Sequence, residues 1–454
     1  MQKNDFRGIA MAVVVFALGI IAVGFTGCDF LEDFVKIQGV EEPPTFVFSG
    51  DSEVEGDSVI DAIRAAKEAG NSEGIFMLNK VVETEMVELG QEDRDLLEEG
   101  LVLCAVPYKM KGTSYITEDD EAAWEDPAAG EEYPANSPAI VTIDGNGRVV
   151  DLTGTNAKNA PLITVGTGVT LTLTNITFKG LKNGDSWADG EGADANDNTA
   201  SLIKVVGSGT LILDNGAVIR DNSGTAAGGG VQLAKSGSGS LTMKTGSEVC
   251  FNTAPYGGGV YISSGSGHEF LMDGGTIRDN SATNTSSYGG GGVCTLSGKF
   301  TMTGGEIKSN TASAYGGGVY IDRGSTFVLT GSGVITENIA NHSFHGGGGV
   351  AVISGTFTMT GGEISLNQAP VVDGTNGGRG GGLWTGDVIK FDKSGGIIYG
   401  SDVPGMANTA TKSETAAIRI GNTYNLKQRN ATSDAKNVLY YERDGGGNVT
   451  ESGW

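Results

Sequence analysis

Charged side chains recur beside a repeated Ile-x-x-Asn motif, and they are the residues of this sequence best suited to acid–base chemistry. In three repeats a basic residue follows the isoleucine of this motif: Arg220, Arg278 and Lys308. In three repeats an acidic residue stands directly before the asparagine: Asp221, Asp279 and Glu337. Enzymes that cleave polysaccharides use paired carboxylates or a basic side chain near bound Ca²⁺. Phe251 and Leu366 interrupt the acidic series. We therefore predict charge pairing between neighbouring repeats on a solvated face, with catalysis as the alternative.

The other reactive residue types form no recognisable site. Histidine occurs only at His268, His342 and His345, without the spacing of a catalytic triad. Cysteines other than Cys28 stand at Cys104, Cys250 and Cys294, an odd number with no Cys-x-x-Cys pattern. We therefore expect no catalytic residue, no metal and no cofactor, and packing roles for these three cysteines.

Aromatic residues recur around a Gly-Gly-Gly-Val motif and are the candidate binding face. Three follow the motif and three precede it: Tyr261, Tyr320 and Trp384, and Tyr256, Tyr288 and Tyr315. A second outward row is predicted from the strand before each Gly-Gly turn: Thr172, Ile212, Thr242, Leu271, Thr301, Val328 and Thr358. We expect exposed aromatic rings that could bind a glycan or a host or matrix protein. The alternative is that these residues are good stacked strand neighbours.

These residues belong to a repeat, which predicts a right-handed parallel β-solenoid of the all-β class. The motif closes on Asn222, Asn252, Asn280, Asn310, Asn338 and Asn367, at spacings of 30, 28, 30, 28 and 29 residues. A fixed period of this size indicates units that bury their apolar faces only by stacking, and the alternation of apolar residues indicates strands.

Both ends of the repeat are interpreted as corners. An asparagine tolerates left-handed backbone, so we expect the six asparagines to form a buried structural ladder of side-chain amides. The three glycines are expected where neighbouring coils approach too closely for a Cβ atom. A phosphate-binding loop is disfavoured because strands rather than a helix follow them.

Charge is unevenly placed along the 454 residues. Residues 29–135 hold 28 acidic and 7 basic side chains, whereas residues 136–454 hold 26 and 21. The acidity therefore belongs to an N-terminal module. No basic face suits nucleic acid, which we exclude as a partner.

The first 28 residues have the pattern of an export signal. Lys3 and Arg7 precede an apolar run from Ile9 to Phe25, and Gly24-Phe25-Thr26-Gly27-Cys28 follows. The segment resembles a bacterial lipobox, which implies that Cys28 carries a lipid and anchors the protein to a membrane. Ordinary secretion and an uncleaved anchor remain alternatives. We expect localisation at the cell envelope, at the outer membrane or cell surface.

The predicted organisation is a signal peptide at 1–28, a tether at 29–57, an acidic capping module at 58–138, the solenoid at 139–421 and a C-terminal cap at 422–454. A capping helix is expected to begin at Ser58 and to bury Ile63. The polar insert 182–199 is expected to project from the solenoid.

The repeats resemble those of polymorphic outer-membrane proteins. The matching motifs are Gly-Gly-Gly-Val and the Ile-x-x-Asn endings IRDN, IKSN, ITEN and ISLN, over residues 139–421. Glycine replaces the alanine usual in that family, and Ile or Val mostly replaces Phe. The resemblance implies a pectate-lyase-like β-helix and a surface adhesin. A C-terminal membrane barrel is not expected, because about 33 residues follow the last coil. A carbohydrate-active enzyme and a structural spacer are the alternatives.

Overall fold

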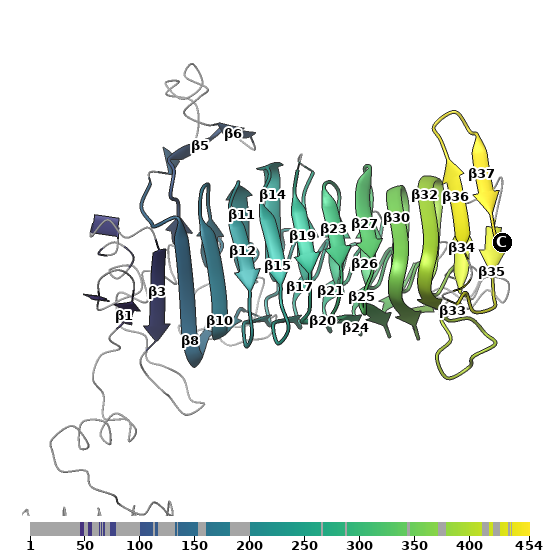
Figure 1. Cartoon of the computed structure of the whole chain (residues 1–454), viewed down its shortest axis with the longest axis horizontal. Helices are drawn as coiled ribbons and strands as arrows, with labels where there is room; N and C mark the ends of the chain where they lie inside the picture. Colours follow the sequence, from purple (N-terminus) through teal and green to yellow (C-terminus); the bar gives the residue numbers. More distant parts are fainter. Residues whose placement is uncertain are drawn as a thin grey trace, which may run out of the picture.

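The protein is a parallel β-solenoid, seen in a computed structural model (Figure 1). The structure describes residues 46–49, 53–56, 63, 65, 67–68, 73–78, 100–111, 114–116, 132–133, 135–152, 160–181, 200–264, 267–286, 288–342, 346–370, 378–410, 417–420, 427–434, 436 and 438–454. Strands are stacked in sequence order along one axis, and the chain descends on the near side while it advances toward the C-terminus. The winding is therefore right-handed.

Each coil contributes strands to three faces. The first face contains β4 (Leu101–Leu103), β9 (Ile163–Val165), β11 (Ile203–Gly207), β14 (Val231–Gly237), β18 (Val260–Ile262), β22 (Val293–Thr295), β26 (Val319–Ile321) and β34 (Ile418–Ile420). The second face contains β3 (Glu73–Leu78), β8 (Ile140–Asp151), β10 (Thr170–Lys179), β12 (Thr210–Leu213), β15 (Ser240–Met243), β19 (Glu269–Met272), β23 (Lys299–Met302) and β27 (Ser325–Leu329). The third face contains β13 (Val218–Arg220), β16 (Glu248–Cys250), β20 (Thr276–Arg278), β24 (Glu306–Lys308) and β28 (Val334–Thr336).

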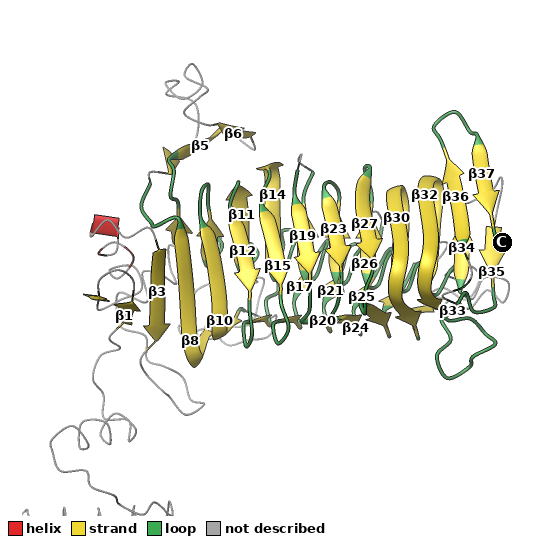
Figure 2. Ribbon diagram, viewed as in Figure 1, coloured by secondary structure: helices red, strands yellow, loops and turns green. Residues whose placement is uncertain are grey.

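β8 and β10 continue from the second face onto the third, and two longer strands run around the corners over all three faces. β30 (Val350–Ser365) and β32 (Leu383–Ile398) pair with strands of all three faces or with each other, in parallel register. Figure 2 shows that strands dominate the described chain.

Apolar side chains fill the interior in columns because every second residue of a strand points inward. Five phenylalanines of the second face form one such column: Phe270, Phe300, Phe327, Phe357 and Phe391. Their rings stack with centroid separations of 4.5, 4.7, 5.0 and 5.4 Å. Because all coils share one register, each repeat buries its apolar face against its neighbours, as the period predicts.

A small fourth sheet lies at the corner after the third face. Its strands are two residues long: β17 (Thr253–Ala254), β21 (Ser281–Ala282), β25 (Thr311–Ala312), β29 (Ile339–Ala340), β31 (Gln368–Ala369) and β33 (Thr409–Ala410). The glycine triplets pack directly on this sheet. A Cβ atom on Gly317 would lie 2.5 Å from the backbone of Ile339. The coils therefore approach too closely there for a side chain, as the triplets predict.

Parallel stacking begins before residue 139, the predicted start of the solenoid. β3 pairs with β8 and β4 pairs with β9, both in parallel register. β1 (Phe46–Ser49) and β2 (Glu53–Gly56) add antiparallel strands at this end. Ile63 is helical and belongs to the main core, and Figure 2 places a short helical piece beside the first coils. A separate sheet contains β5 (Tyr108–Lys111), β6 (Ser114–Ile116) and β7 (Glu132–Tyr133).

The C-terminal end reverses strand direction. β34 is the last parallel strand, and β35 (Lys427–Arg429) pairs with it in antiparallel register. β36 (Leu439–Arg443) pairs antiparallel with β32, and β37 (Val449–Ser452) pairs with β36. Trp454 lies beside Phe391, the last ring of the phenylalanine column. The reversed strands cover the edge that the last coil would otherwise expose.

Cys28, residues 29–45 of the predicted tether, the insert 182–199 and His345 lie outside the described residues, whereas β1 and β2 fall within the predicted tether. Among the residues that the structure describes, no helix is long and apolar enough to cross a bilayer.

Candidate functional site: an asparagine ladder, a charged corner and an aromatic ridge

The six predicted asparagines lie in one buried row at the corner after the third face. Asn310 shows the pattern. Its Oδ1 accepts hydrogen bonds from the backbone N and the Nδ2 of Asn280, both at 3.0 Å. Its Nδ2 donates to the carbonyl of Ile277 and to Oδ1 of Asn338, both at 2.9 Å. Each amide therefore connects the coil before it to the coil after it.

The left-handed backbone at this corner belongs to the residue before each asparagine, which corrects our expectation. The residues with φ between +54° and +59° are Asp221, Phe251, Asp279, Ser309, Glu337 and Leu366. The physical reason is that the asparagine must point inward to reach its neighbours, so the turn is made one residue earlier. The side chain of Phe251 lies under the guanidinium of Arg278, 4.6 Å from the ring centroid to Cζ.

Asn408 is a seventh member of the ladder that the sequence analysis missed. Its Oδ1 accepts the backbone N of Asn367 at 3.0 Å, and it is fully buried. It follows Asn367 by 41 residues, partly because residues 401–406 form turns between the third face and the corner and partly because the segment before Leu383 is longer than in the preceding coil. The pattern Asn-x-Ala, which five of the six predicted asparagines share, recurs at Asn408-Thr409-Ala410 and could have identified it.

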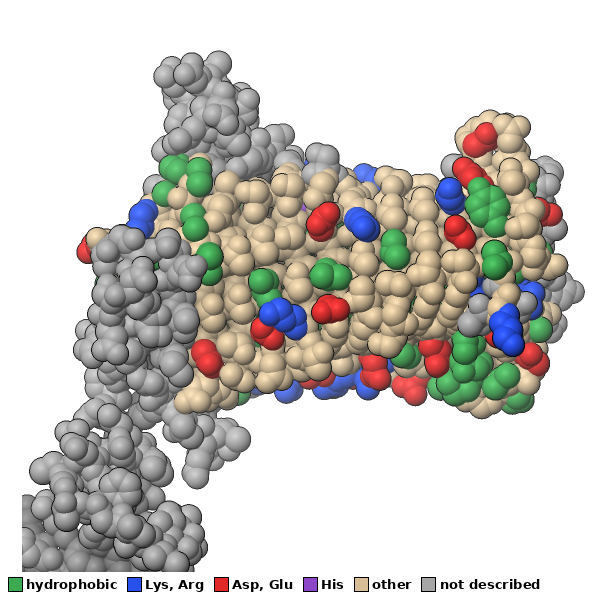
Figure 3. Space-filling model, viewed as in Figure 1, with side chains coloured by type: hydrophobic (Ala, Val, Ile, Leu, Met, Phe, Trp, Pro, Cys, Tyr) green, Lys and Arg blue, Asp and Glu red, His purple; other side chains and the backbone are tan. Residues whose placement is uncertain are grey.

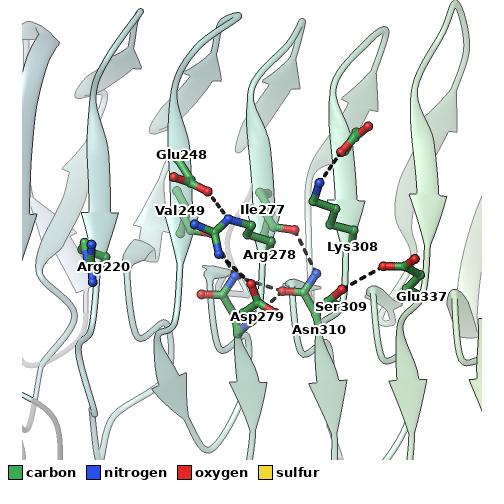
Figure 4. A network of polar contacts seen from close by, with 12 residues as sticks. Arg220, Glu248, Val249, Ile277, Arg278, Asp279, Lys308, Ser309, Asn310 and Glu337 are labelled. Atoms are coloured by element: carbon green, nitrogen blue, oxygen red, sulfur yellow. Dashed lines mark hydrogen bonds and ion pairs between the residues drawn. The ribbon is translucent and has the colours of Figure 1, made fainter.

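The charged residues beside the ladder pair with one another (Figure 4). Arg278 contacts Glu248 of the preceding coil and donates to Asp279 at 2.7 Å. Lys308 lies 2.9 Å from Glu306, and Arg220 pairs with Asp221. Charge pairing is thus partly between coils, as with Arg278, and partly within one coil.

These ion pairs keep Arg278 and Lys308 protonated, so neither is available as a base near neutral pH. Burial opposes the charge of Arg278, but its hydrogen bonds to Glu248 and Asp279 prevail and raise its pKa. The hydrogen bond to Glu306 raises the pKa of Lys308. A general base needs a pKa near the working pH, and both shifts run the other way.

Aromatic side chains form a continuous ridge over the first face, which we call the aromatic ridge: Tyr256, Tyr288, Tyr315, Tyr320, His342 and Trp384. Tyr256 and Tyr288 meet edge to face at 5.3 Å between centroids. Tyr315 stacks on His342 at 4.5 Å and on Trp384 at 5.5 Å. Tyr288 and Tyr315 each contact Tyr320. The ridge therefore connects the turns of successive coils.

The expectation that Tyr320 and Trp384 are exposed is wrong. Both point away from the main core, but each is only 2% exposed. They form a second apolar cluster with Cys294, Leu296 and Ala351. The reason is that the turns before the glycine triplets fold back over the first face, so Tyr256, Tyr288 and Tyr315 cover them.

Tyr256, Tyr261, Tyr288 and Tyr315 are half-buried. Burial raises the pKa of Tyr261 to about 12 and also raises the pKa of Tyr315. The phenols of Tyr261 and Tyr315 are therefore neutral at physiological pH, able to offer hydrogen bonds and ring faces but no charge.

The three described cysteines are buried, and none of them forms a disulfide with another described cysteine. Burial raises the pKa of Cys250 to about 12 and that of Cys294 far above its usual value. Because the thiolate is the nucleophile, neither side chain is suited to covalent chemistry. The predicted packing role of all three fits this burial.

The described part of the chain holds no group of three His, Cys, Asp or Glu side chains placed to bind a metal ion. What the arrangement offers chemically is a row of half-buried tyrosines over the first face and, on the third face, paired charges beside the asparagine ladder. No family model, curated protein or solved structure matches this chain. The resemblance to polymorphic outer-membrane proteins therefore rests on the repeat motifs and on the parallel β-solenoid that they form.

Proposed function

We propose that this protein is an exported, lipid-anchored adhesin or interaction scaffold of the cell envelope. The observation that carries the proposal is the aromatic ridge, in which half-buried tyrosines from successive coils lie side by side. A tyrosine side chain combines an apolar ring with a hydroxyl group and loses little conformational entropy on binding. These properties suit contacts with sugars or protein surfaces. The paired charges of the neighbouring corner support binding rather than catalysis.

Cys28 is the proposed membrane anchor, because it directly follows small residues after an apolar run. Cys28→Ser should leave the protein soluble or retained as its precursor. Detergent partitioning and the mass of the processed chain provide the measurement. Full partitioning of the variant with the processed mass would exclude lipidation at this residue.

The ridge is tested by changing Tyr256, Tyr288 and Tyr315 together to Ser. These residues are half-buried and lie on turns, so the solenoid should remain folded. We expect binding on a glycan and matrix-protein array to fall at least about tenfold, since aromatic anchors dominate interfaces. The control changes the half-buried Tyr399 and Tyr440, which lie outside the ridge.

A folded triple variant that binds like the unchanged protein would reject the ridge as the binding face. The same preparations are screened for polysaccharide cleavage. Release of cleaved products would place the protein among the carbohydrate-active β-helices instead.

A further inference from the structure

The second face carries a central row on its outer surface that is uncharged from β8 to β30 and ends at Asp392 of β32. Threonines alternate there with larger aliphatic residues over successive strands: Thr142, Thr172, Ile212, Thr242, Leu271, Thr301, Val328 and Thr358. Leu271 is 37% exposed, and the other members are half-buried. Figure 3 shows this face toward the viewer, with isolated hydrophobic side chains along its middle and few charges. Because these strands share one register, the side chains of the row lie one above another.

A second row of outward side chains lies beside the central row, at the start of each strand. Two neighbouring members of this row carry opposite charges. Glu269 of β19 and Lys299 of β23 are register partners, and both are exposed. Neither forms an ion pair with a described side chain, although the Lys244–Asp214 pair on the same face does. Their nearest row neighbours on either side, Ser240 and Thr326, are uncharged.

The row that follows each strand is divided differently. Its charges lie in the N-terminal half, at Asp214, Lys244 and Asp273, and threonines occupy the C-terminal half, at Thr303, Thr330 and Thr360. These charges already have partners within the chain. Lys244 pairs with Asp214 at 2.7 Å, and Thr303 donates to Asp273 at 2.6 Å.

We propose that two copies of this chain pair through the second face, about a two-fold axis that runs along the strands between β19 and β23. Such an axis places β19 of one copy on β23 of the other, because a two-fold interface is self-complementary. Glu269 then meets Lys299 of the second copy, twice in each dimer. In the central row Leu271 meets Thr301, and the adjacent strands oppose Thr242 to Val328.

On the same axis β10 lies on β32, so that Thr172 meets Asp392. β12 lies on β30, so that Ile212 meets Thr358 and each aliphatic side chain of this half packs against a threonine methyl group. The charged half of the third row meets the threonine half, so no like charges face each other. An axis between β15 and β19 would oppose Lys244 to Asp273, but both of these already have intrachain partners. The unpaired charges therefore favour the axis between β19 and β23.

The area is sufficient for a reversible dimer. Eight strands overlap about this axis: β10, β12, β15, β19, β23, β27, β30 and β32. At about 4.8 Å apart and about 13 Å long they bury roughly 500 Å² per copy, or about 1,000 Å² in total. This is the lower end of the range for specific interfaces, so a dissociation constant in the micromolar range is expected. The Glu269–Lys299 contacts set the register more than they add affinity.

The test measures association of the full chain, purified in detergent, by sedimentation velocity over a concentration series. Glu269→Lys and Lys299→Glu should each weaken the dimer at least about tenfold, because like charges then meet twice at the axis. The double variant restores opposite charges and should recover the affinity to within about threefold. Unfolding curves check that each exposed substitution leaves the fold intact.

The matched control is Glu363→Lys, a half-buried charge of β30 on the third face, which should not change association. A chain that stays monomeric throughout the series would overturn the proposal. So would single reversals without effect, or a double variant that is not rescued. Dissociation by Asp273→Lys but not by Glu269→Lys would overturn this register in favour of the axis between β15 and β19.

Discussion

Asn310 illustrates how a single side chain holds three coils together. Its amide makes four hydrogen bonds to Asn280, Ile277 and Asn338, and no part of it reaches solvent. A buried donor or acceptor that loses its partner has no water to replace it. The ladder therefore stabilises the stack mainly because its removal would leave backbone groups unsatisfied.

Replacing Asn310 with Ala should lower the free energy of unfolding by about 1–3 kcal/mol, because the backbone N of Asn280 and the carbonyl of Ile277 lose their partners. Chemical denaturation measures the change. Asn215→Ala, on an exposed turn, is the control and should stay within about 0.5 kcal/mol. Equal midpoints for the two variants would contradict the role of the ladder.

The residues directly before the ladder asparagines adopt left-handed backbone, which costs conformational free energy. A substitution that suits this conformation should reduce the cost. Glu337 is exposed and has a φ of +59°, a conformation that asparagine adopts more easily than glutamate. Glu337→Asn should therefore raise the free energy of unfolding by about 0.5–1 kcal/mol. Glu337→Gln removes the same charge and keeps the backbone cost, so no such gain is expected. If both variants unfold alike, backbone strain is not the cause.

At the level of elements, alternation and period were enough to predict the inward columns and the corners. Val260, Val293 and Val319 are buried, as the strand alternation requires. The same alternation says only that Tyr320 and Trp384 point away from the main core. Whether something covers them depends on the turns before the glycine triplets, whose path has no period of its own. Asn408 was missed for a related reason, because an insertion breaks the spacing.

Lys393 is an unusual member of an inward column on the second face. It lies in register with Met359 and is 0% exposed. Its Nζ donates to the carbonyl of Asp434 at 2.7 Å, within the C-terminal segment. Burial lowers the pKa of Lys393 to about 8, against the opposing effect of Asp434.

Lys393 should make stability depend on pH in a defined window. Between about pH 8 and 10.5 the unfolded chain keeps a proton on this lysine that the folded chain releases. The contribution of Lys393 to the free energy of unfolding therefore rises by at most about 3 kcal/mol as the pH increases across this window. The same contribution is lost as the pH falls back through 8. Lys393→Met should remove this dependence.

The measurement is the difference in unfolding free energy between the unchanged protein and Lys393→Met at pH 8 and pH 10. Taking the difference cancels the titration of tyrosines and cysteines, which both proteins share. We expect Lys393→Met to be the more stable protein at pH 8, with the gap narrowing at pH 10. A constant gap would show that the lysine does not titrate in this range.

At the scale of the whole molecule, a solenoid has two ends at which strand edges could pair with other chains. The C-terminal end is closed by β36 and β37, which run opposite to the stack. Leu439 and Tyr441 of β36 belong to the main core, and Trp454 donates to the carbonyl of Tyr440 at 2.9 Å. The hairpin therefore contributes both core burial and edge protection.

Deleting residues 438–454 should expose the edge of β32 and the ring of Phe391. The lost burial of Leu439, Tyr441 and Trp454 should lower the melting temperature by several degrees, and the free edge should pair between chains. Light scattering during a concentration series measures this association. Trp454→Ala serves as the control, because it removes ring contact but keeps β36 on the edge. It should lower the melting temperature without producing species larger than the unchanged chain forms. A truncated chain that is no larger than the unchanged protein would show that the hairpin does not protect the edge.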